Sequence, residues 1–202
     1  MDLKIPYMFY TSAIEPKVCN RIIEFGKTKV KPAFINHLSL SKETDNDIRN
    51  SRVSWLTDEW IYELIDPYIK NTNEQAGWYW KFNHIEPIQF TKYGLNEHYD
   101  WHTDSGSDHF AVYKNEVGRG LNGNVRKISV TVNLVDGSEY EGGNLEFDFG
   151  PKGGKDRIKV CDEIKPKGSI IVFPSFIPHR VTPVTKGIRY SLVMWVIGKP
   201  WQ

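Results

Sequence analysis

The sequence predicts a mainly β fold, a double-stranded β-helix (jelly roll) with N-terminal α-helices packed on one sheet. After residue 78, apolar and polar residues alternate with a period of two in many short segments, and turns rich in glycine and proline separate these segments. Two segments have apolar residues at helical spacing, and both lie before residue 78. A length of 202 residues suits one domain. We therefore expect residues 1–77 to form a helical support and residues 78–198 to form the jelly-roll core.

Two helices are expected in the first third of the chain. The first covers residues 15–26 and has Pro16 in its first turn. The second follows Thr57 or Asp58, and Pro67 should kink or interrupt it. Each has one apolar face, formed by Val18, Ile22 and Phe25 in the first helix and by Trp60, Ile61, Leu64, Ile65 and Tyr68 in the second. Between the helices, residues 37–50 are polar and lack a clear period, so we expect a mobile loop there.

The strands are predicted from alternation and from flanking turn residues. They cover residues 78–82, 85–93, 127–135, 144–149, 168–173, 179–184 and 188–196. In the 127–135 segment, Ile128, Val130, Val132 and Leu134 alternate with Ser129, Thr131 and Asn133. One face of this strand is therefore apolar and the other can form hydrogen bonds. A polar face inside a barrel is expected to line a pocket, and the mouth of a jelly roll suits a small ligand.

Composition excludes several classes of protein. The formal net charge is +1, which gives no broad attraction to nucleic acid or to an anionic membrane, and we expect neither as a partner. Cys19 and Cys161 are far apart and lack Cys-x-x-Cys spacing, so we expect reduced interior residues rather than a disulfide framework or a thiolate zinc site. No segment has the pattern of a signal peptide or a membrane span, and a cytoplasmic protein is expected.

Residues 99–104 contain the most informative spacing, because His102 and Asp104 lie two residues apart. In an extended strand this spacing points both side chains to the same face. His179 follows a proline-punctuated turn between two apolar segments and is the candidate for a third ligand. Two imidazoles and one carboxylate form the facial triad that holds Fe(II) while leaving coordination positions open.

Arg189 lies ten residues after His179, in the middle of an apolar strand. Burying an unpaired guanidinium there would cost several kcal/mol, so something anionic should pair with it. An internal Asp or Glu is one candidate, and a small dicarboxylate held by a bidentate contact is the other. Ser191, two residues further on, lies on the same face and can add a hydroxyl hydrogen bond.

The order His-x-Asp, a long gap, His and then Arg-x-Ser, between residues 89 and 195, resembles the 2-oxoglutarate- and Fe(II)-dependent dioxygenases, and more narrowly their prolyl 4-hydroxylase-like branch. The run of residues 141–147 also resembles a segment of this family. The resemblance implies that His102, Asp104 and His179 bind iron, that Arg189 pairs with the distal carboxylate of 2-oxoglutarate, and that Tyr93 hydrogen-bonds the same cosubstrate. Ser191, Asn133 and Thr131 are further candidates for contacts to it.

The resemblance also implies an activity. With Fe(II) and O2, the family decarboxylates 2-oxoglutarate to succinate, and ascorbate is a candidate reductant. Hydroxylation is the expected reaction because Asp104 is present, whereas the related halogenases lack this carboxylate. No catalytic residue is expected beyond the metal centre. The candidate substrates are prolyl or other protein side chains, with free amino acids and small metabolites also open.

The segment of residues 105–124 is long, rich in glycine and adjoins Asp104. A loop of this length is usually functional or disordered, so we expect it to close over the substrate. Phe110 and Tyr113 would be apolar contacts and Arg119 a polar one, and Tyr99 is a further candidate for a substrate contact. An ordered segment that merely covers the barrel remains the alternative.

Other interpretations stay open on sequence alone. His98 and His102 have the helical spacing of zinc proteases, although no Glu follows His98. Asp108 and His109 could substitute as ligands, but they stand in the reverse order within the predicted loop. The chain could also be a cupin-like metalloenzyme that does not use 2-oxoglutarate, or a jelly-roll binding module without catalysis.

Overall fold

The computed structural model describes residues 3–28, 30–33, 48–106, 112–114, 121–150 and 157–201. The larger of its sheets contains β1 (Met8–Tyr10), β2 (Lys31–Pro32), β4 (Arg52–Leu56), β5 (His84–Ile85), β6 (Ile88–Tyr93), β8 (Val125–Asn133), β12 (Ile170–Pro174) and β15 (Arg189–Gly198). The strand order is β1-β12-β8-β15-β6-β4-β2, with β5 paired to the end of β15. The named pairs in this sheet are antiparallel.

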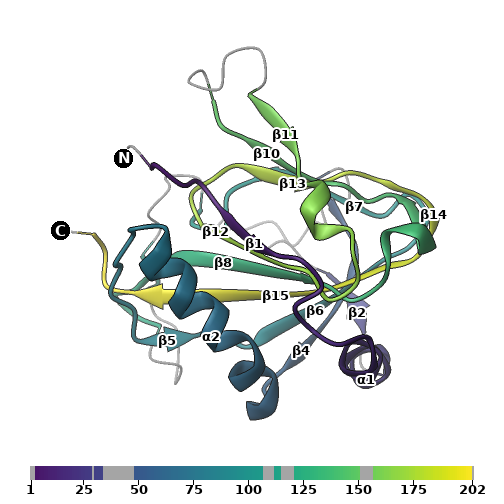
Figure 1. Cartoon of the computed structure of the whole chain (residues 1–202), viewed down its shortest axis with the longest axis horizontal. Coiled ribbons are helices and arrows are strands. Elements are labelled where there is room, and N and C mark those ends of the chain that lie inside the picture. Colours follow the sequence, from purple (N-terminus) through teal and green to yellow (C-terminus); the bar gives the residue numbers. More distant parts are fainter. Residues whose placement is uncertain are drawn as a thin grey trace.

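The smaller sheet contains β3 (Arg49–Asn50), β7 (His98–His102), β10 (Leu145–Asp148), β11 (Ile158–Val160) and β13 (His179–Val181), in the order β11-β10-β13-β7-β3. A separate ribbon pairs β9 (Tyr140–Gly142) with β14 (Val184–Gly187). Two short 3-10 turns, η1 (Gly137–Glu139) and η3 (Asp162–Ile164), connect strands. The two main sheets form separate layers in Figure 1, with β10, β13 and β7 above the larger sheet. The predicted jelly-roll architecture is confirmed.

The two helices, α1 (Pro16–Lys27) and α2 (Glu59–Gln75), lie against the larger sheet, and α2 crosses in front of it in Figure 1. α1 has the predicted bounds within one residue. α2 continues through Pro67 to Gln75, so the expected interruption is wrong. The missing N–H of proline removes one helical hydrogen bond. The buried residues on both sides of Pro67, including Ile61, Ile65 and Ile69, keep the helix continuous by packing on the sheet.

Side chains alternate along each strand of the larger sheet, so that one face packs on the helices and the other faces the smaller sheet. On β15, the side chains of Tyr190, Leu192, Met194 and Val196 belong to the hydrophobic core shared with the helices. The alternate residues of the same strand, beginning with Arg189, point to the opposite face, toward the smaller sheet. β6 and β8 follow the same rule, so the polar face predicted on residues 127–135 lies between the two sheets.

Residues 78–82 do not form the predicted strand. Trp78 and Trp80 stack with ring centroids 5.0 Å apart, and Tyr79 between them has a positive φ of 52°. The Asn73 side chain at the end of α2 accepts a hydrogen bond from the Trp80 N–H and donates one to the Trp80 carbonyl. Aromatic packing and the two hydrogen bonds of the Asn73 side chain therefore hold this segment in place of strand pairing.

Three further boundaries differ from the prediction. Residues 85–93 are divided at Glu86 and Pro87 into β5 and β6, and residues 179–184 are divided between β13 and β14. In the polar segment 37–50, residues 34–47 lie outside the described residues, but its end forms β3, which pairs with β7. That pairing brings Arg49 beside the strand of the His-x-Asp motif.

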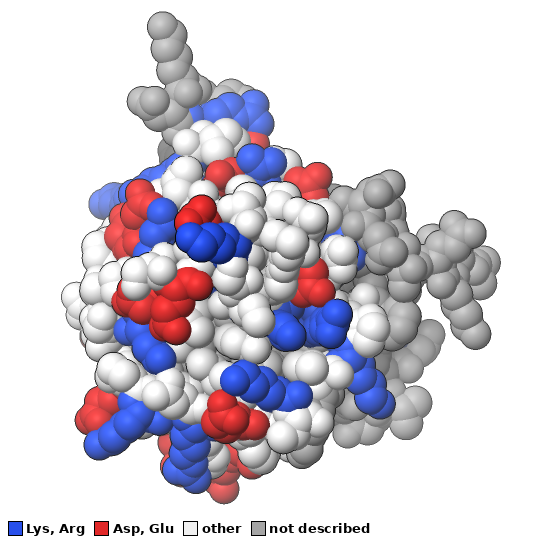
Figure 2. All heavy atoms as spheres, turned by 90° about the vertical axis from the view of Figure 1, so that its right-hand side faces the viewer, with Lys and Arg blue, Asp and Glu red and all other residues white. Residues whose placement is uncertain are grey.

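The surface agrees with the balanced composition. Basic and acidic side chains are interspersed on the face seen in Figure 2. Exposed ion pairs such as Lys186 with Glu141 are part of this balance of charge. Cys19 and Cys161 are buried and free, and burial raises the pKa of the Cys161 thiol to about 12. Within the ranges that the structure describes, no helix is both long enough and apolar enough to span a membrane.

Candidate metal site and adjoining cavity

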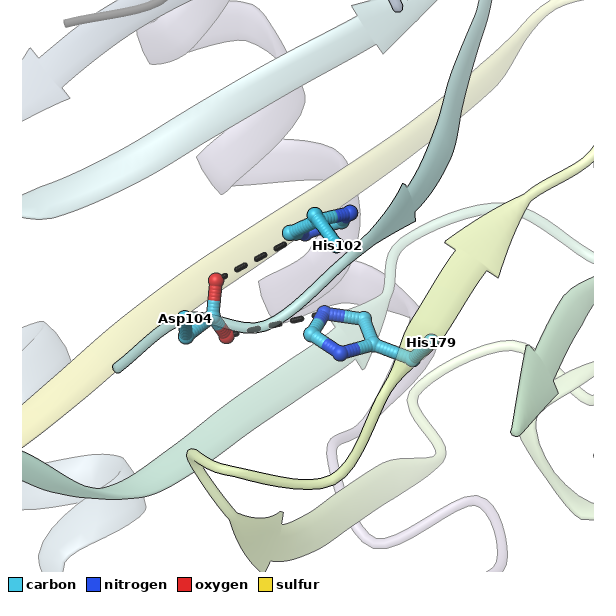
Figure 3. A group of neighbouring side chains, drawn as sticks. All are labelled: His102, Asp104 and His179. Carbon is cyan, nitrogen blue, oxygen red and sulfur yellow. Dashed lines mark ion pairs between the residues drawn. The ribbon is translucent and has the colours of Figure 1, made fainter. Parts of the chain in front are cut away.

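Three side chains that can bind a metal converge between the sheets, as predicted. The donor atoms of His102, Asp104 and His179 all lie within 4.8 Å of one another. Nε2 of His102 is 3.6 Å from Oδ1 of Asp104, and Nε2 of His179 is 3.6 Å from Oδ2 (Figure 3). With small side-chain shifts one ion can contact all three. The donor set of two imidazoles and one carboxylate suits Fe(II) with open positions.

The two histidines are brought together by strand pairing, since His102 on β7 lies directly opposite His179 on β13. Asp104 is placed differently from the prediction. β7 ends at His102, and Asp104 lies in the following turn. The backbone N–H groups of Asp104 and Ser105 both donate to the carbonyl of Ser175, at 2.9 and 3.1 Å. The turn, rather than an extended strand, therefore sets the direction of the carboxylate.

Backbone carbonyls orient both imidazoles. Nδ1 of His102 lies 2.8 Å from the carbonyl oxygen of Asp100, and Nδ1 of His179 lies 3.0 Å from that of Ile177. A carbonyl only accepts, so each Nδ1 carries the proton and each Nε2 keeps a lone pair directed at the site. Partners of this kind typically fix the tautomer of a metal-binding histidine. The Tyr99 ring stacks on His102, with centroids 3.5 Å apart, and further restricts its rotation.

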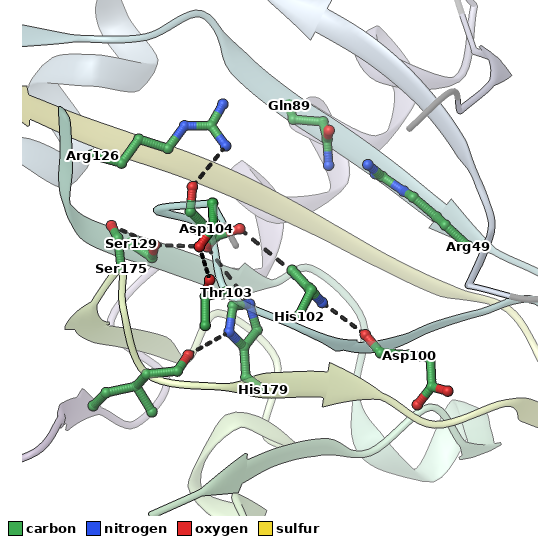
Figure 4. A network of polar contacts seen from close by, with 12 residues as sticks. Arg49, Gln89, Asp100, His102, Thr103, Asp104, Arg126, Ser129, Ser175 and His179 are labelled. Carbon is green, nitrogen blue, oxygen red and sulfur yellow. Dashed lines mark hydrogen bonds and ion pairs between the residues drawn. The ribbon is translucent and has the colours of Figure 1, made fainter. Parts of the chain in front are cut away.

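The carboxylate of Asp104 is held in its ionised form. Burial alone would raise its pKa, but His179, His102 and Arg126 together bring the pKa below its ordinary value. The Ser129 hydroxyl donates to Oδ2 at 2.6 Å and is itself 2.9 Å from the Ser175 hydroxyl (Figure 4). Burial, reinforced by the neighbouring His102, lowers the pKa of His179 to about 4, against the opposing effect of Asp104. An ionised carboxylate and a neutral imidazole are the forms that bind a metal.

The cavity beside these donors extends to Arg189 and is lined by residues of both sheets. Predicted residues in its wall are Tyr93, Tyr99, Thr131, Arg189 and Ser191. The sequence analysis did not assign Gln89, Val193 or Trp195 to the site, although the period of two on β6 and β15 could have found them. Ser129 was predicted only as a polar lining residue, and the structure adds its bond to Asp104.

Arg189 is 1% exposed, and its environment leaves the guanidinium incompletely bonded. Nη1 reaches the Ser191 hydroxyl at 3.5 Å, while Nε and Nη2 have no hydrogen-bond partner among the described residues. The Tyr93 ring lies 5.5 Å from the guanidinium carbon, and burial raises the pKa of its hydroxyl. A buried cation with free N–H groups needs an anion to offset its desolvation. The metal donors and Arg189 thus fit a small dicarboxylate that bridges them.

Two neighbouring arginines have acidic partners. Arg126 pairs with Glu86 through two contacts of 2.7 Å, and Arg180 pairs with Glu146 at 2.8 Å. Neither guanidinium is available to replace Arg189 as the anion-binding group. The Arg126 guanidinium also lies 3.8 Å from the centroid of the Trp195 ring and 3.4 Å from the carbonyl oxygen of Asp104. The Arg126–Glu86 pair therefore adjoins the metal site.

Within the run of residues 141–147, the backbone and the close neighbours at position 143 require a glycine. Gly143 has a positive φ of 57°, and a Cβ there would lie 3.2 Å from Cδ of Arg189 and 3.0 Å from a methyl carbon of Val184. The missing side chain therefore leaves room for the stem of Arg189. A residue other than glycine would be strained by the backbone and crowded by its neighbours.

Some predicted residues are not brought to the cavity. The Asn133 amide donates to the carbonyls of Val135 and Lys165, at 2.6 and 2.8 Å. The Tyr113 hydroxyl donates to Glu86 at 2.8 Å. Neither residue is part of the described cavity wall, so their contacts to cosubstrate and substrate stay predictions. His98 lies in strand β7, so the helical zinc-protease spacing is wrong.

The substrate loop is only partly described. Phe110 and Arg119, together with the alternative ligands Asp108 and His109, lie outside the described residues. Their roles and the closing of the 105–124 segment stay predictions.

Comparisons with known proteins agree with this site. A sequence model of the 2OG-Fe(II) oxygenase superfamily matches residues 88–197, a little over half of the chain. A PKHD-type hydroxylase of Xylella fastidiosa (strain M12) is 34% identical over 110 residues, which cover 54% of this chain and 44% of that relative. This chain thus spans less than half the length of the curated relatives it matches.

Solved structures share the fold over nearly the whole chain. A Pseudomonas putida prolyl-4-hydroxylase superposes with a TM-score of 0.65 at 17% identity and covers 98% of this chain and 95% of its own. A Trichoplax adhaerens prolyl hydroxylase, in complex with a hypoxia inducible factor peptide fragment, superposes with a TM-score of 0.66 at 15% identity and covers 96% and 84%. Taken with the match of the family model, these findings mean that the chain belongs to the 2OG-Fe(II) oxygenase superfamily, whose members use Fe(II), 2-oxoglutarate and O2.

Proposed function

We propose that the chain is a single-domain Fe(II)- and 2-oxoglutarate-dependent hydroxylase. One observation carries the proposal: a triad with two free Nε2 lone pairs shares its cavity with a fully buried arginine whose Nε and Nη2 lack hydrogen-bond partners among the described residues. A cupin-like enzyme without 2-oxoglutarate would not need that arginine, and a binding module would not need the triad. Family membership and the names of the relatives support the same activity.

In this proposal each residue has a defined role. His102, Asp104 and His179 hold the iron, and Arg189 and Ser191 bind the distal carboxylate of 2-oxoglutarate. Tyr93, through its hydroxyl, and Thr131 complete the wall around the cosubstrate. When bound, iron and 2-oxoglutarate activate O2, so that 2-oxoglutarate leaves as succinate and carbon dioxide and one oxygen atom enters a C–H bond of the substrate.

The protein contributes position and the exclusion of water. Ser129 and the backbone contacts of Asp104 hold the carboxylate ligand, and the carbonyls of Asp100 and Ile177 orient the imidazoles. The apolar side chains of Leu145, Phe173 and Val181 line the cavity beside the donors. A dry, preorganised site strengthens each charged contact and protects the reaction from competing water.

Prolyl or other protein side chains are the proposed substrates. The matched relative is named a PKHD-type hydroxylase, and the structural neighbours are prolyl hydroxylases, one of them bound to a peptide fragment. The half-exposed Trp55 lies next to Trp195 of the cavity wall and offers an apolar surface for a peptide.

The test begins without O2. Purified protein mixed with Fe(II) and 2-oxoglutarate should develop the weak visible metal-to-ligand charge-transfer band. Addition of O2 should then produce succinate. No band and no succinate would reject the use of 2-oxoglutarate and favour the cupin-like alternative.

A panel of proline-containing peptides, read by mass for a gain of one oxygen, tests the substrate. If no peptide is modified while uncoupled succinate formation proceeds, the prolyl assignment is wrong and the hydroxylase assignment survives.

A further inference from the structure

A second buried arginine contacts Tyr99, which is a residue of the cavity wall. Arg49, on β3, is 9% exposed. Its Nε donates to the Ser51 hydroxyl at 3.0 Å, and its buried Nη2 has no hydrogen-bond partner among the residues that the structure describes. Unlike Arg52, Arg126 and Arg180, it has no ion pair with an acid anywhere in the described ranges. Desolvation of an unpaired guanidinium is costly, so the site is built for an anion.

Arg49 adjoins the cavity wall at Tyr99. Its guanidinium carbon lies 4.5 Å over the Tyr99 ring, whose other face is covered by His102. Tyr99 lines the cavity, and Arg49 opposes the rise that burial causes in the pKa of both Tyr99 and Tyr93. In Figure 4 the side chains of Arg49 and Gln89 extend toward one another, and Gln89 is part of the cavity wall.

The two unpaired arginines belong to opposite sheets. Arg189 projects from β15 of the larger sheet and is assigned above to the cosubstrate, whereas Arg49 projects from β3 of the smaller sheet. A single 2-oxoglutarate presents one distal carboxylate, which Arg189 and Ser191 can bind. The second guanidinium therefore calls for a second anionic group, and the substrate is the remaining occupant of the site.

An aromatic surface adjoins this position. Trp55 pairs with Gln89 across β4 and β6, so both side chains lie on the same face of the sheet. Trp55 is 53% exposed, and its ring lies 6.2 Å from that of Trp195, which lines the cavity. An exposed tryptophan next to the cavity wall suits the apolar body of a group whose charged end binds an arginine.

We propose that Arg49 binds a carboxylate of the substrate, at a position separated by Tyr99 from the metal site, while the apolar part of the substrate packs against Trp55. This inference rests on the proposed function. The Tyr99 ring stands between Arg49 and His102, so the carboxylate lies several bonds from the carbon that is hydroxylated. A C-terminal carboxylate or an acidic side chain next to the target residue provides this chemistry.

Matched peptide pairs test the inference by binding. One pair is acetyl-Pro-Gly with a free carboxylate and its C-terminal amide, and the other is acetyl-Pro-Glu-amide and acetyl-Pro-Gln-amide. Calorimetry is performed without O2, on the protein with Fe(II) and saturating 2-oxoglutarate and again on the metal-free protein. The acidic member of at least one pair should bind roughly tenfold or more tightly than its neutral partner, and the pair that does so identifies the source of the carboxylate.

Arg49→Gln should abolish this difference between acidic and neutral members. Arg52→Gln is the matched control, because Arg52 lies three residues further along, is exposed and pairs with Glu97, and it should retain the difference.

Equal binding within both pairs, no detectable binding of any probe, or an unchanged difference in Arg49→Gln would each overturn the proposal. If Arg49→Gln weakens 2-oxoglutarate binding as much as Arg189→Gln does, Arg49 belongs to the cosubstrate site and the proposal is wrong. Failure of 2-oxoglutarate to bind at all would instead reject the proposed function. The affinities of the peptide pairs could then still be compared in the metal-free protein, so the role of Arg49 would be tested separately.

Discussion

The two ends of the cavity differ in how completely the protein bonds its own polar groups. At the metal end, Asp104 is held by Ser129 and by its backbone contacts to Ser175, and each imidazole donates to a carbonyl. At the other end, the buried guanidinium of Arg189 makes one hydrogen bond of 3.5 Å to Ser191. The first end is preorganised by the protein alone, while the second is completed only by a ligand.

The contrast between Arg126 and Arg189 shows the same difference. Both guanidiniums lie near the site, but Arg126 has a bidentate carboxylate partner in Glu86 and Arg189 has none among the described residues. A buried ion pair supports a structure, whereas a buried unpaired charge lowers its stability until a counter-ion arrives. The comparison separates residues that maintain the site from residues that bind its ligand, and variants can test that separation.

The largest effect is expected for the metal ligands. His179→Ala and His102→Ala should each lower Fe(II) affinity by more than the roughly 10- to 100-fold that follows loss of an outer partner of a ligand. Anaerobic metal titration measures this. His98→Ala is the control, since His98 lies on the same strand but outside the triad. Wild-type affinity in either ligand variant would reject the assignment.

The next effect concerns stability. Glu86→Gln should lower the free energy of unfolding by roughly 3–5 kcal/mol, because Arg126 would keep a buried charge without its partner. Arg189→Met should be neutral or stabilising in the protein without ligand, because it removes a charge that has no partner. Chemical denaturation compares both with the wild type. Equal destabilisation by the two variants would contradict the distinction between a supporting pair and a ligand-binding group.

Arg189→Ala should raise the 2-oxoglutarate concentration needed for turnover by tens-fold, corresponding to about 2 kcal/mol for a lost charge-assisted contact. Iron should remain bound. Tyr93→Phe should act in the same direction but more weakly. Arg180→Ala, which removes a paired arginine, serves as control. An unchanged dependence on 2-oxoglutarate in Arg189→Ala would assign the distal carboxylate to another basic residue.

The smallest effects should distinguish two serines. Ser129→Ala is expected to weaken Fe(II) binding by about tenfold, because Asp104 loses the donor that orients its Oδ2. Ser191→Ala should instead weaken 2-oxoglutarate binding by a few-fold and leave iron affinity unchanged. Each variant is measured for both ligands. If the two serines affect the same ligand, the cavity does not have two separate ends.

The chemistry of the site was predictable from the sequence because it depends on a few residue types at short spacings. His102, Asp104, His179 and Arg189 were all identified in this way, and the structure brings them to one cavity. Thr131 and Ser191 followed from the period of two on their strands. Asn133 obeys the same period but does not line the cavity, and only the folded chain shows that its amide bonds two carbonyls.

The set of chemical groups and the strand faces on which they lie follow from the sequence. The folded chain was needed to show that Asp104 is directed by a turn bonded to Ser175, that Glu86 neutralises Arg126 across forty residues, and that Arg49 contacts Tyr99 of the cavity wall from a two-residue strand. Local spacing specifies the direction of a side chain within one strand. The partner that restrains or neutralises it comes from a distant segment, and long-range packing alone selects that partner.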